Sequence, residues 1–186
     1  MGDVFLSERC KKCGHRLCNC SCHKECKTCV QKVFIKSAPS VFSPAFGNFY
    51  QTNFITLVRN QPMPWNATGQ TAGGVNLDSD GVTIHVTQAG SYYIDYYVSV
   101  NYNPDTPGGD RDLGLFINGV EVPNNQTRFG VSDYEADRNG CATVSGGSIV
   151  FIPANATVQL RNVLDEIIDT CDGRKLAASI NLIKLS

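Results

Sequence analysis

Seven of the nine cysteines in this 186-residue chain lie within the twenty positions from Cys10 to Cys29, and this cluster most constrains how the chain folds. Leu17 is the only large apolar residue between them. A segment of this composition buries too little apolar surface to fold around a hydrophobic core, so only metal ligation or disulfide bonds would give it a fixed structure. We therefore expect the core to lie in the rest of the chain.

Charge divides the chain at a similar place. Residues 1–36 carry eight basic and three acidic side chains, a net charge of +5, whereas the remainder carries eight basic and fourteen acidic side chains, a net charge of −6. The Pro- and Ser-containing segment Ser37–Pro44 separates the two parts. The predicted organisation is a basic cysteine-rich head over residues 1–29, a connector over 30–44 and a folded domain over 45–186. Opposite charges would attract the head of one molecule to the body of another.

Two classes of membrane-related segment are absent from the sequence pattern. No stretch approaches the roughly 18 apolar residues that a bilayer span requires, so we expect no membrane partner. The first eight residues include Asp3 and Glu8 and lack the apolar core of a secretory signal. We expect synthesis in the cytoplasm without a signal peptide.

The sequence after residue 44 has the pattern of an all-β domain. From Tyr92 to Val100, alternate positions form an apolar face, and Tyr93, Asp95, Tyr97 and Ser99 form a second face. Asn118-Gly119 between two apolar runs is the strongest hairpin signal in the chain. About ten short strands predict a sandwich, jelly roll or barrel. The predicted strands are Ala45–Tyr50, Phe54–Val58, Met63–Trp65, Val75–Leu77, Val82–Val86, Tyr92–Val100, Leu113–Ile117, Val120–Val122, Cys141–Ile152, Thr157–Val163 and Leu176–Leu185. Leu164–Thr170 reads as either a helical turn or a wide loop.

Several motifs, taken in order, carry a family resemblance. They are Pro62–Asn66, Val75–Asp78, Val82–Ile84, Gly90–Ile94, Leu115–Pro123 and Ala178–Leu185. Together they resemble the C-terminal domain of the collagen-like exosporium glycoprotein family of Bacillus spores (BclA-like), over roughly Ala45–Ser186. The pattern at Gly90–Tyr96 is shared with the wider superfamily of tumour-necrosis-factor and complement heads. No Gly-X-Y repeat precedes the domain here, so the mode of attachment must differ from a collagen stalk.

The resemblance implies a jelly roll of two sheets, packed as a threefold homotrimer without enzymatic activity, on a spore surface such as an exosporium, coat or appendage. Other spore-surface proteins would be its partners. In such a trimer Tyr93 and Tyr97 would supply contact area between subunits. The alternative is that both tyrosines lie under a loop of their own chain.

The cysteine-rich head admits three interpretations. Its donors are Cys10, Cys13, Cys18, Cys20, Cys22, Cys26 and Cys29, with His15 and His23. Pairs with Cys-x-x-Cys spacing can share a Zn²⁺ ion, for example one held by Cys10, Cys13, Cys26 and Cys29. Alternatively, seven is an odd number, so at least one thiol is free to crosslink a neighbouring subunit once the spore surface becomes oxidising. The third interpretation is a disordered basic tail whose cysteines stay reduced.

The apolar run Val30–Lys36, which includes Val33, Phe34 and Ile35, also has two interpretations. It is either the first strand of its own jelly roll or a strand that adds to the open edge of another subunit. Strand addition that does not close on itself would stack trimers into a fibre.

Cys141 and Cys171 belong to the body, where each sits beside a turn. They form either one disulfide, which would close a loop and stabilise the fold, or two buried thiols.

Enzymatic and nucleic-acid functions find little support in the sequence. His85 is the only histidine of the body, and no nucleophile motif accompanies it. The head is basic but lacks the aromatic platforms that grip single strands. The acidic segments Asp105–Asp112 and Asp165–Asp172 lack the spacing of a calcium loop and are expected to be solvated. The predicted function is a non-enzymatic structural subunit or anchor. The competing prediction is a receptor- or carbohydrate-binding head that uses the loops Asn103–Asp112 and Asn124–Tyr134.

Overall fold

The computed structural model describes residues 6–10, 29–33, 42–102, 109–133, 140–171 and 176–186. Internal contacts divide the chain into two units, Met1–Phe42 and Ser43–Ser186. The two units are described separately below. The predicted boundaries at residues 29 and 44 stay predictions, and the first of them falls inside a strand.

The described part of the first unit is an antiparallel pair of strands, β1 (Leu6–Cys10) and β2 (Cys29–Val33). The register runs from Leu6 opposite Val33 to Cys10 opposite Cys29. Val30 and Val33 therefore pair with β1. The interpretation that this run is the first strand of its own jelly roll is wrong, because β2 belongs to a separate two-stranded sheet. Addition of this run to another subunit stays a prediction, and Phe34 and Ile35 lie outside the described residues.

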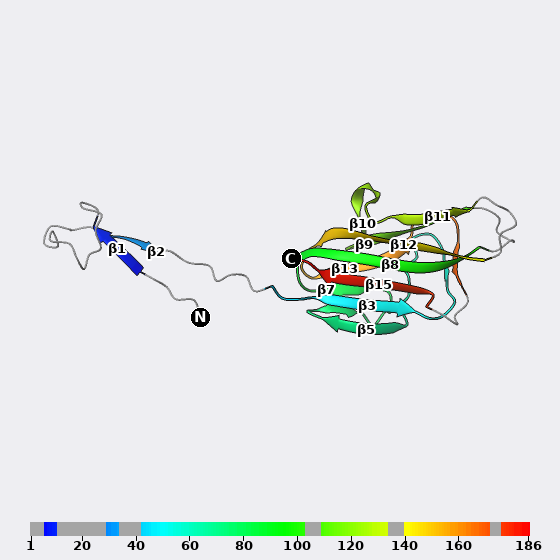
Figure 1. Ribbon diagram of the computed structural model, residues 1–186, viewed down its shortest axis with the longest axis horizontal. Helices are drawn as coiled ribbons and strands as arrows, with labels where there is room; N and C mark the ends of the chain where they lie inside the picture. The colour runs from blue at the N-terminus through cyan, green and yellow to red at the C-terminus, as the bar shows by residue number, and fades with distance from the viewer. Residues whose placement is uncertain (1–5, 11–28, 34–41, 103–108, 134–139, 172–175) are drawn as a thin grey trace. The chain divides into compact units, whose positions relative to one another are not determined.

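The second unit is a sandwich of two antiparallel sheets, as predicted for an all-β jelly roll (Figure 1). One sheet has seven strands in the order β4-β14-β8-β15-β3-β5, with β12 also paired to β8. The other has six strands in the order β10-β9-β13-β7-β6, with β11 also paired to β9. The strands are β3 (Phe46–Gln51), β4 (Thr56–Leu57), β5 (Ala67–Ala72), β6 (Val75–Leu77), β7 (Ile84–Val86), β8 (Gly90–Tyr102), β9 (Gly109–Ile117), β10 (Val120–Glu121), β11 (Phe129–Asp133), β12 (Gly140–Ile152), β13 (Ala156–Asn162), β14 (Ile168–Thr170) and β15 (Ala178–Lys184).

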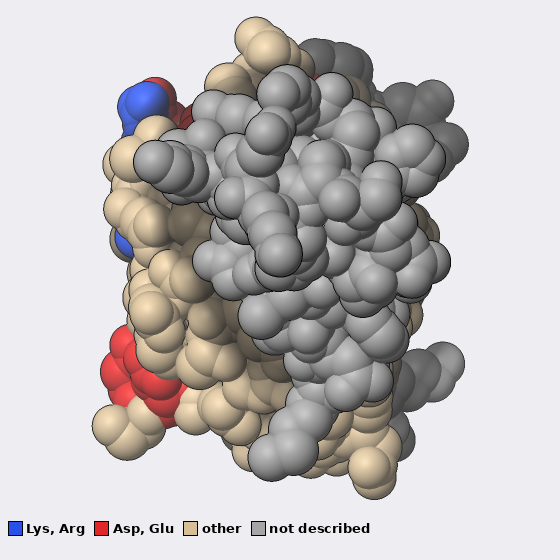
Figure 2. Space-filling model, turned by 90° about the vertical axis from the view of Figure 1, so that its left-hand side faces the viewer, with Lys and Arg blue, Asp and Glu red and all other residues tan. Residues whose placement is uncertain are grey.

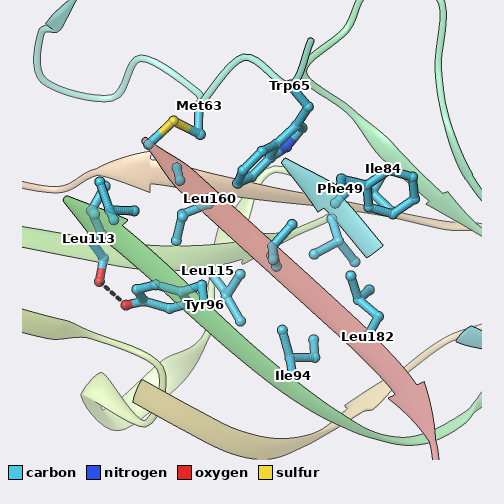
Figure 3. Packing of buried hydrophobic residues seen from close by; sticks show 14 of the residues in the cluster. Phe49, Met63, Trp65, Ile84, Ile94, Tyr96, Leu113, Leu115, Leu160 and Leu182 are labelled. Carbon is cyan, nitrogen blue, oxygen red and sulfur yellow. Dashed lines mark hydrogen bonds between the residues drawn. The ribbon is translucent and has the colours of Figure 1, made fainter. Parts of the chain in front are cut away.

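The core lies between the two sheets, where the alternating pattern of β8 places its apolar face. Tyr92, Ile94, Tyr96, Val98 and Val100 are all buried there. Facing side chains come from the other sheet, including strands β7, β9 and β13, and Figure 3 shows how they interdigitate. This packing confirms the predicted core face of β8.

Tyr96 also anchors the sandwich through its buried hydroxyl. The hydroxyl lies 2.6 Å from the carbonyl oxygen of Leu113, the contact drawn in Figure 3, and 2.9 Å from that of Thr127. It accepts a hydrogen bond from the backbone N–H of Phe129 at 3.1 Å. Burial raises the pKa of the Tyr96 phenol, so the group stays a hydrogen-bond donor.

Turn chemistry fixes the hairpin between β9 and β10. Asn118 and Gly119 both adopt positive φ angles, 52° and 79°, as a two-residue turn of this kind requires. The Asn118 side-chain oxygen accepts a hydrogen bond from the backbone N–H of Thr157 at 2.9 Å, which ties the turn to β13. The predicted hairpin is confirmed.

Two sequence predictions about elements are wrong. Met63–Trp65 forms no strand; Pro62 makes an isolated bridge to Arg161, and Met63 and Trp65 are buried in the core. The segment after Leu164 is not entirely a turn or loop, because Ile168–Thr170 forms β14, which pairs with β4 and β8. The backbone N–H groups of Met63 and Trp65 donate to two different segments, at Leu160 and Gly81, so no strand pairs with Met63–Trp65. In β14, pairing with β4 and β8 decides the structure.

The start of β3 and the C-terminus at Ser186 lie at the same end of the second unit (Figure 1). The backbone N–H of Lys184 donates to Ala45 and that of Leu185 donates to Ser91. Most of the described surface visible in Figure 2 belongs to uncharged residues, with one group of acidic side chains at the lower left and further charged side chains of both signs at the upper left. Within the described ranges, no helix has the length and hydropathy of a membrane span.

Candidate self-association surface

The outer face of the seven-stranded sheet carries an apolar row that crosses four neighbouring strands. Strand register aligns Phe46 on β3 with Ile183 on β15, Ile183 with Tyr93 on β8, and Tyr93 with Ile149 on β12. Cross-strand neighbours in register have their side chains in contact range on the same face. The row is therefore one continuous apolar strip rather than four scattered side chains.

Two more apolar side chains extend this strip toward the end of the unit where the chain terminates. Phe151 lies two residues beyond Ile149 on β12, and Leu185 follows Ile183 beside Ser91. We call Phe46, Tyr93, Ile149, Phe151, Ile183 and Leu185 the apolar patch. Its members are between 36% and 65% exposed. Contiguous exposed apolar residues on this scale are typical of interaction sites.

A polar row lies beside the apolar row on the same face. The Asn48 side-chain N–H donates to Asn181 Oδ1 at 2.8 Å, and the Asn181 side-chain N–H donates to Asp95 Oδ2 at 3.1 Å. Gly147 completes the row on β12, opposite Asp95. The hydrogen bonds fix these side chains in one arrangement, so a partner would meet a preorganised surface.

Tyr93 and Tyr97, the two predicted interface residues, both lie on this outer face. Tyr93 is 38% exposed, and Tyr97 is half-buried in the next row. The ring of Tyr93 leans over Gly147: a β-carbon added to Gly147 would lie 2.9 Å from Tyr93 Cζ and would overlap the hydroxyl. The absence of a side chain at Gly147 thus lets the tyrosine lie flat along the sheet.

A groove runs along the β3 side of the same face. It has a volume of about 250 Å³ and is lined by Phe46, Gly47, Asn48, Gln70, Asn181, Leu182 and Ile183. No lining residue is charged. Phe151 and Ile149 lie on the opposite side of β8 and β15, so the face combines a groove with projecting apolar side chains.

The outer face of the six-stranded sheet provides a contrast, because several of its polar side chains contact one another. The Arg161 guanidinium stacks on the Phe116 ring, 4.5 Å from its centroid, and donates to Gln159 Oε1. Gln159 in turn donates to the Thr83 hydroxyl at 2.7 Å. His85 lies half-buried on β7, opposite Thr157. This face suits water, whereas the apolar patch does not.

A disulfide joins Cys141 and Cys171, whose α-carbons are 6.0 Å apart. Cys141 is the second residue of β12 and lies opposite Asn101 of β8, and the Cys171 backbone N–H donates to Ser99 of β8. The bond therefore crosses β8 and links the segments on either side of it. Of the two alternatives left by the sequence, the structure contains the disulfide.

The acidic segments do not assemble a metal site among the described residues. Asp165 forms an exposed ion pair with Arg59. Asp110 and Asp112 lie on β9, and burial, followed by the nearby Asp110 carboxylate, raises the pKa of Asp112. Within the described ranges no group of three or more His, Cys, Asp or Glu side chains is arranged to hold a metal ion.

Part of the predicted sites lies outside the described residues. Cys10 and Cys29 belong to β1 and β2, whereas Cys13, Cys18, Cys20, Cys22, Cys26, His15 and His23 are not described. Of the two loops predicted for ligand binding, Gly109–Asp112 belongs to β9, and Pro123–Asn125 forms a short 3₁₀-helix followed later by β11. Residues 103–108 and 134 are outside the description.

Scans against models of known protein families and against curated proteins give no match. Solved structures do match. An Eiger tumour-necrosis-factor structure from S. frugiperda is 15% identical with a TM-score of 0.55, and covers 78% of this chain and 93% of its own. The globular domain of zebrafish complement 1qA is 14% identical with a TM-score of 0.54, covering 76% and 98%. Murine APRIL at pH 5.0 is 10% identical with a TM-score of 0.57, covering 77% and 100%. The second unit thus has the jelly-roll fold of tumour-necrosis-factor and complement heads.

Proposed function

We propose that this chain is a non-enzymatic structural protein whose jelly roll self-associates through the apolar patch into a closed trimer. In this proposal the cysteine-rich head couples trimers to one another or to other proteins. The observation that carries the proposal is the uncovered apolar row Phe46–Ile183–Tyr93–Ile149, which crosses four strands of a sheet whose opposite face is core. Burying this row would stabilise the assembly by about 25 cal/mol for each Å² of apolar surface removed from water.

The arrangement of this face favours a heterologous contact, in which two different parts of the face meet between copies. The groove lies on the β3 side, and the projecting Ile149 and Phe151 lie on the β12 side, so unlike parts of two copies are complementary. A contact between unlike surfaces produces a ring when the rotation closes. The number three comes from the sequence resemblance, which implies a threefold trimer.

The biological setting of the proposal is a spore surface, as an exosporium, coat or appendage component. Its support is the sequence resemblance of Ala45–Ser186 to the exosporium glycoprotein family, together with the cysteine-rich head in place of a collagen stalk. A surface that becomes oxidising after synthesis would allow the head to form disulfide crosslinks late. The jelly-roll fold is compatible with this setting and with a receptor-binding role.

Substitution of one patch residue tests the trimer. Ile183→Asp would place a carboxylate in an apolar interface, where an unpaired charge is strongly unfavourable, and we expect the trimer to dissociate to monomers. Ile183 is exposed in the single copy, so the fold should survive. The matched control is Val120→Asp, because Val120 is 70% exposed on the other sheet. Light scattering after size-exclusion chromatography gives the mass. A wild-type monomer at high concentration, oxidised or reduced, would contradict the proposal.

Removal of residues 1–36 tests the role of the head. We expect the shortened protein to trimerise but to be missing from the native assembly. Normal incorporation of the shortened protein would show that the head has no coupling role. Full-affinity binding of a receptor or carbohydrate by the shortened protein would instead favour the competing function as a binding head.

A further inference from the structure

We propose that Cys10 and Cys29 form an intrachain disulfide that closes the hairpin of β1 and β2 at the point where residues 11–28 leave it. This inference concerns the head alone and does not require the trimer. Its consequence for coupling rests on the proposed function: the head's seven cysteines divide into one structural pair and five thiols available for other bonds.

Backbone register carries the inference. Cys10 is the last residue of β1, Cys29 is the first residue of β2, and they are direct partners in the antiparallel ladder. Directly opposite residues in such a ladder have α-carbons about 4.5–5.5 Å apart. Disulfides require about 4.4–6.8 Å between α-carbons, so the backbone needs no movement to accept this bond. Cys10 and Cys29 are the only cysteines within the described part of the first unit.

The hairpin also needs such a bond for stability. Each strand has five residues, and the only large apolar residues in them are Leu6, Val30 and Val33. An isolated two-stranded hairpin is marginally stable in water, and closing an intervening segment of 18 residues adds an entropic cost. A disulfide at the base of that segment removes most of this cost from the unfolded chain.

The chemistry is an ordinary thiol–disulfide exchange. The thiolate of one cysteine attacks a small-molecule disulfide such as glutathione disulfide, forms a mixed disulfide and releases one glutathione thiolate. The second cysteine thiolate then attacks the mixed disulfide and releases the second glutathione. The two protein thiols lose two protons and two electrons, and one glutathione disulfide is reduced to two thiols.

The five remaining cysteines of the head are Cys13, Cys18, Cys20, Cys22 and Cys26. Because five is odd, they cannot all pair within one head, and at least one is left for a bond to a second molecule. The Cys10–Cys29 bond would therefore hold the base of the segment while the thiols between its ends make the coupling bonds.

The test uses the full-length chain, mixed in equal amounts with a copy uniformly labelled with ¹⁵N and oxidised with glutathione disulfide. After denaturation and alkylation of free thiols, disulfide-linked peptides are mapped by mass spectrometry. We expect Cys10 linked to Cys29 in peptides that are either fully labelled or fully unlabelled. Links between labelled and unlabelled peptides should involve only the other five cysteines. The double variant Cys10→Ser, Cys29→Ser should lose the pure-label link, whereas the matched control Cys13→Ser, Cys26→Ser should keep it.

Three results would overturn the inference. Cys10 and Cys29 could both be found alkylated, either could be linked to a different cysteine, or the Cys10–Cys29 link could join a labelled peptide to an unlabelled one. Copurification of one equivalent of zinc, with both cysteines alkylated only after chelation, would also overturn it in favour of a metal site. An intact pure-label Cys10–Cys29 link without any mixed-label peptide would leave the disulfide standing and contradict the coupling role of the head. The two ideas therefore fail separately.

Discussion

At the scale of single residues, Gly147 shows how a missing side chain shapes the candidate surface. Glycine usually weakens a strand, because it adds no packing and costs backbone entropy. Here its lack of a β-carbon leaves room for Tyr93 on the neighbouring strand to lie along the sheet. The glycine thus determines how closely the Tyr93 ring of the apolar patch can approach β12.

We expect Gly147→Ala to weaken trimer formation by at least tenfold while changing the free energy of unfolding of the single copy by less than about 1 kcal/mol. The new methyl group would displace only the exposed end of Tyr93, so the fold tolerates it but the shape of the patch changes. Gly140→Ala is the matched control on the same strand, because a β-carbon there meets nothing within 4 Å. Sedimentation equilibrium and urea unfolding measure the two quantities. Equal association by both variants would contradict the assigned role of Tyr93.

Two aspartates should respond to pH with opposite signs. Hydrogen bonds from the Thr83 hydroxyl and the Val82 backbone lower the pKa of Asp80, so its ionised form stabilises the fold above the unfolded-state pKa and this contribution is lost as pH falls. Burial and Asp110 raise the pKa of Asp112, so ionisation of Asp112 opposes folding as pH rises through its folded-state pKa.

At pH 7 we therefore expect Asp80→Asn to lower the free energy of unfolding and Asp112→Asn to raise it. Near pH 3, which lies below the raised pKa of Asp112, that carboxyl group is protonated, so the effect of Asp112→Asn should disappear. Urea unfolding of the two variants and the wild-type chain across pH 3–8 provides the measurement. A destabilising effect of Asp112→Asn at pH 7 would show that its carboxylate makes a favourable contact that outweighs burial.

At the scale of strands, the sequence predicts an element well where the element's own side chains alternate. Apolar and polar positions alternate through β8, so its core face and its outer face follow from the sequence alone. β5 (Ala67–Ala72) contains no large apolar residue, and its strand conformation depends on pairing with β3. Such a strand has no local signal, because its partner supplies the stabilising hydrogen bonds.

The disulfide acts at this scale because it holds segments on both sides of β8. We expect reduction, or the double variant Cys141→Ser, Cys171→Ser, to lower the free energy of unfolding by about 3–4 kcal/mol, since the bond closes a loop with a sequence separation of 30 residues. The m-value should rise, because the unfolded chain becomes less compact. Urea unfolding of the residues 43–186 fragment with and without reductant avoids interference from the head. An unchanged midpoint would contradict a stabilising role.

At the scale of the whole molecule, Tyr93 and Tyr97 show how far the candidate site could be predicted. Alternation places both tyrosines on the outer face, which the structure agrees with. The other members of the apolar row, Phe46, Ile149 and Ile183, are separated from Tyr93 by tens of residues. Only the register between strands brings them into one row, and register depends on tertiary pairing that no local pattern specifies.

The division of the chain into two units leads to the last prediction, which concerns residues 43–186 produced without the first unit. The hydrophobic core begins at Ala45, and every described core residue belongs to the second unit. We expect this fragment to unfold at the same urea concentration as the full chain and to form the same trimer. Under oxidising conditions the full chain should form covalent multimers on a non-reducing gel, whereas the fragment should not, because Cys141 and Cys171 are already joined. A fragment that is unfolded or monomeric while the full chain is trimeric would mean that the first unit takes part in folding or trimer formation, and the head would then be more than a coupling segment.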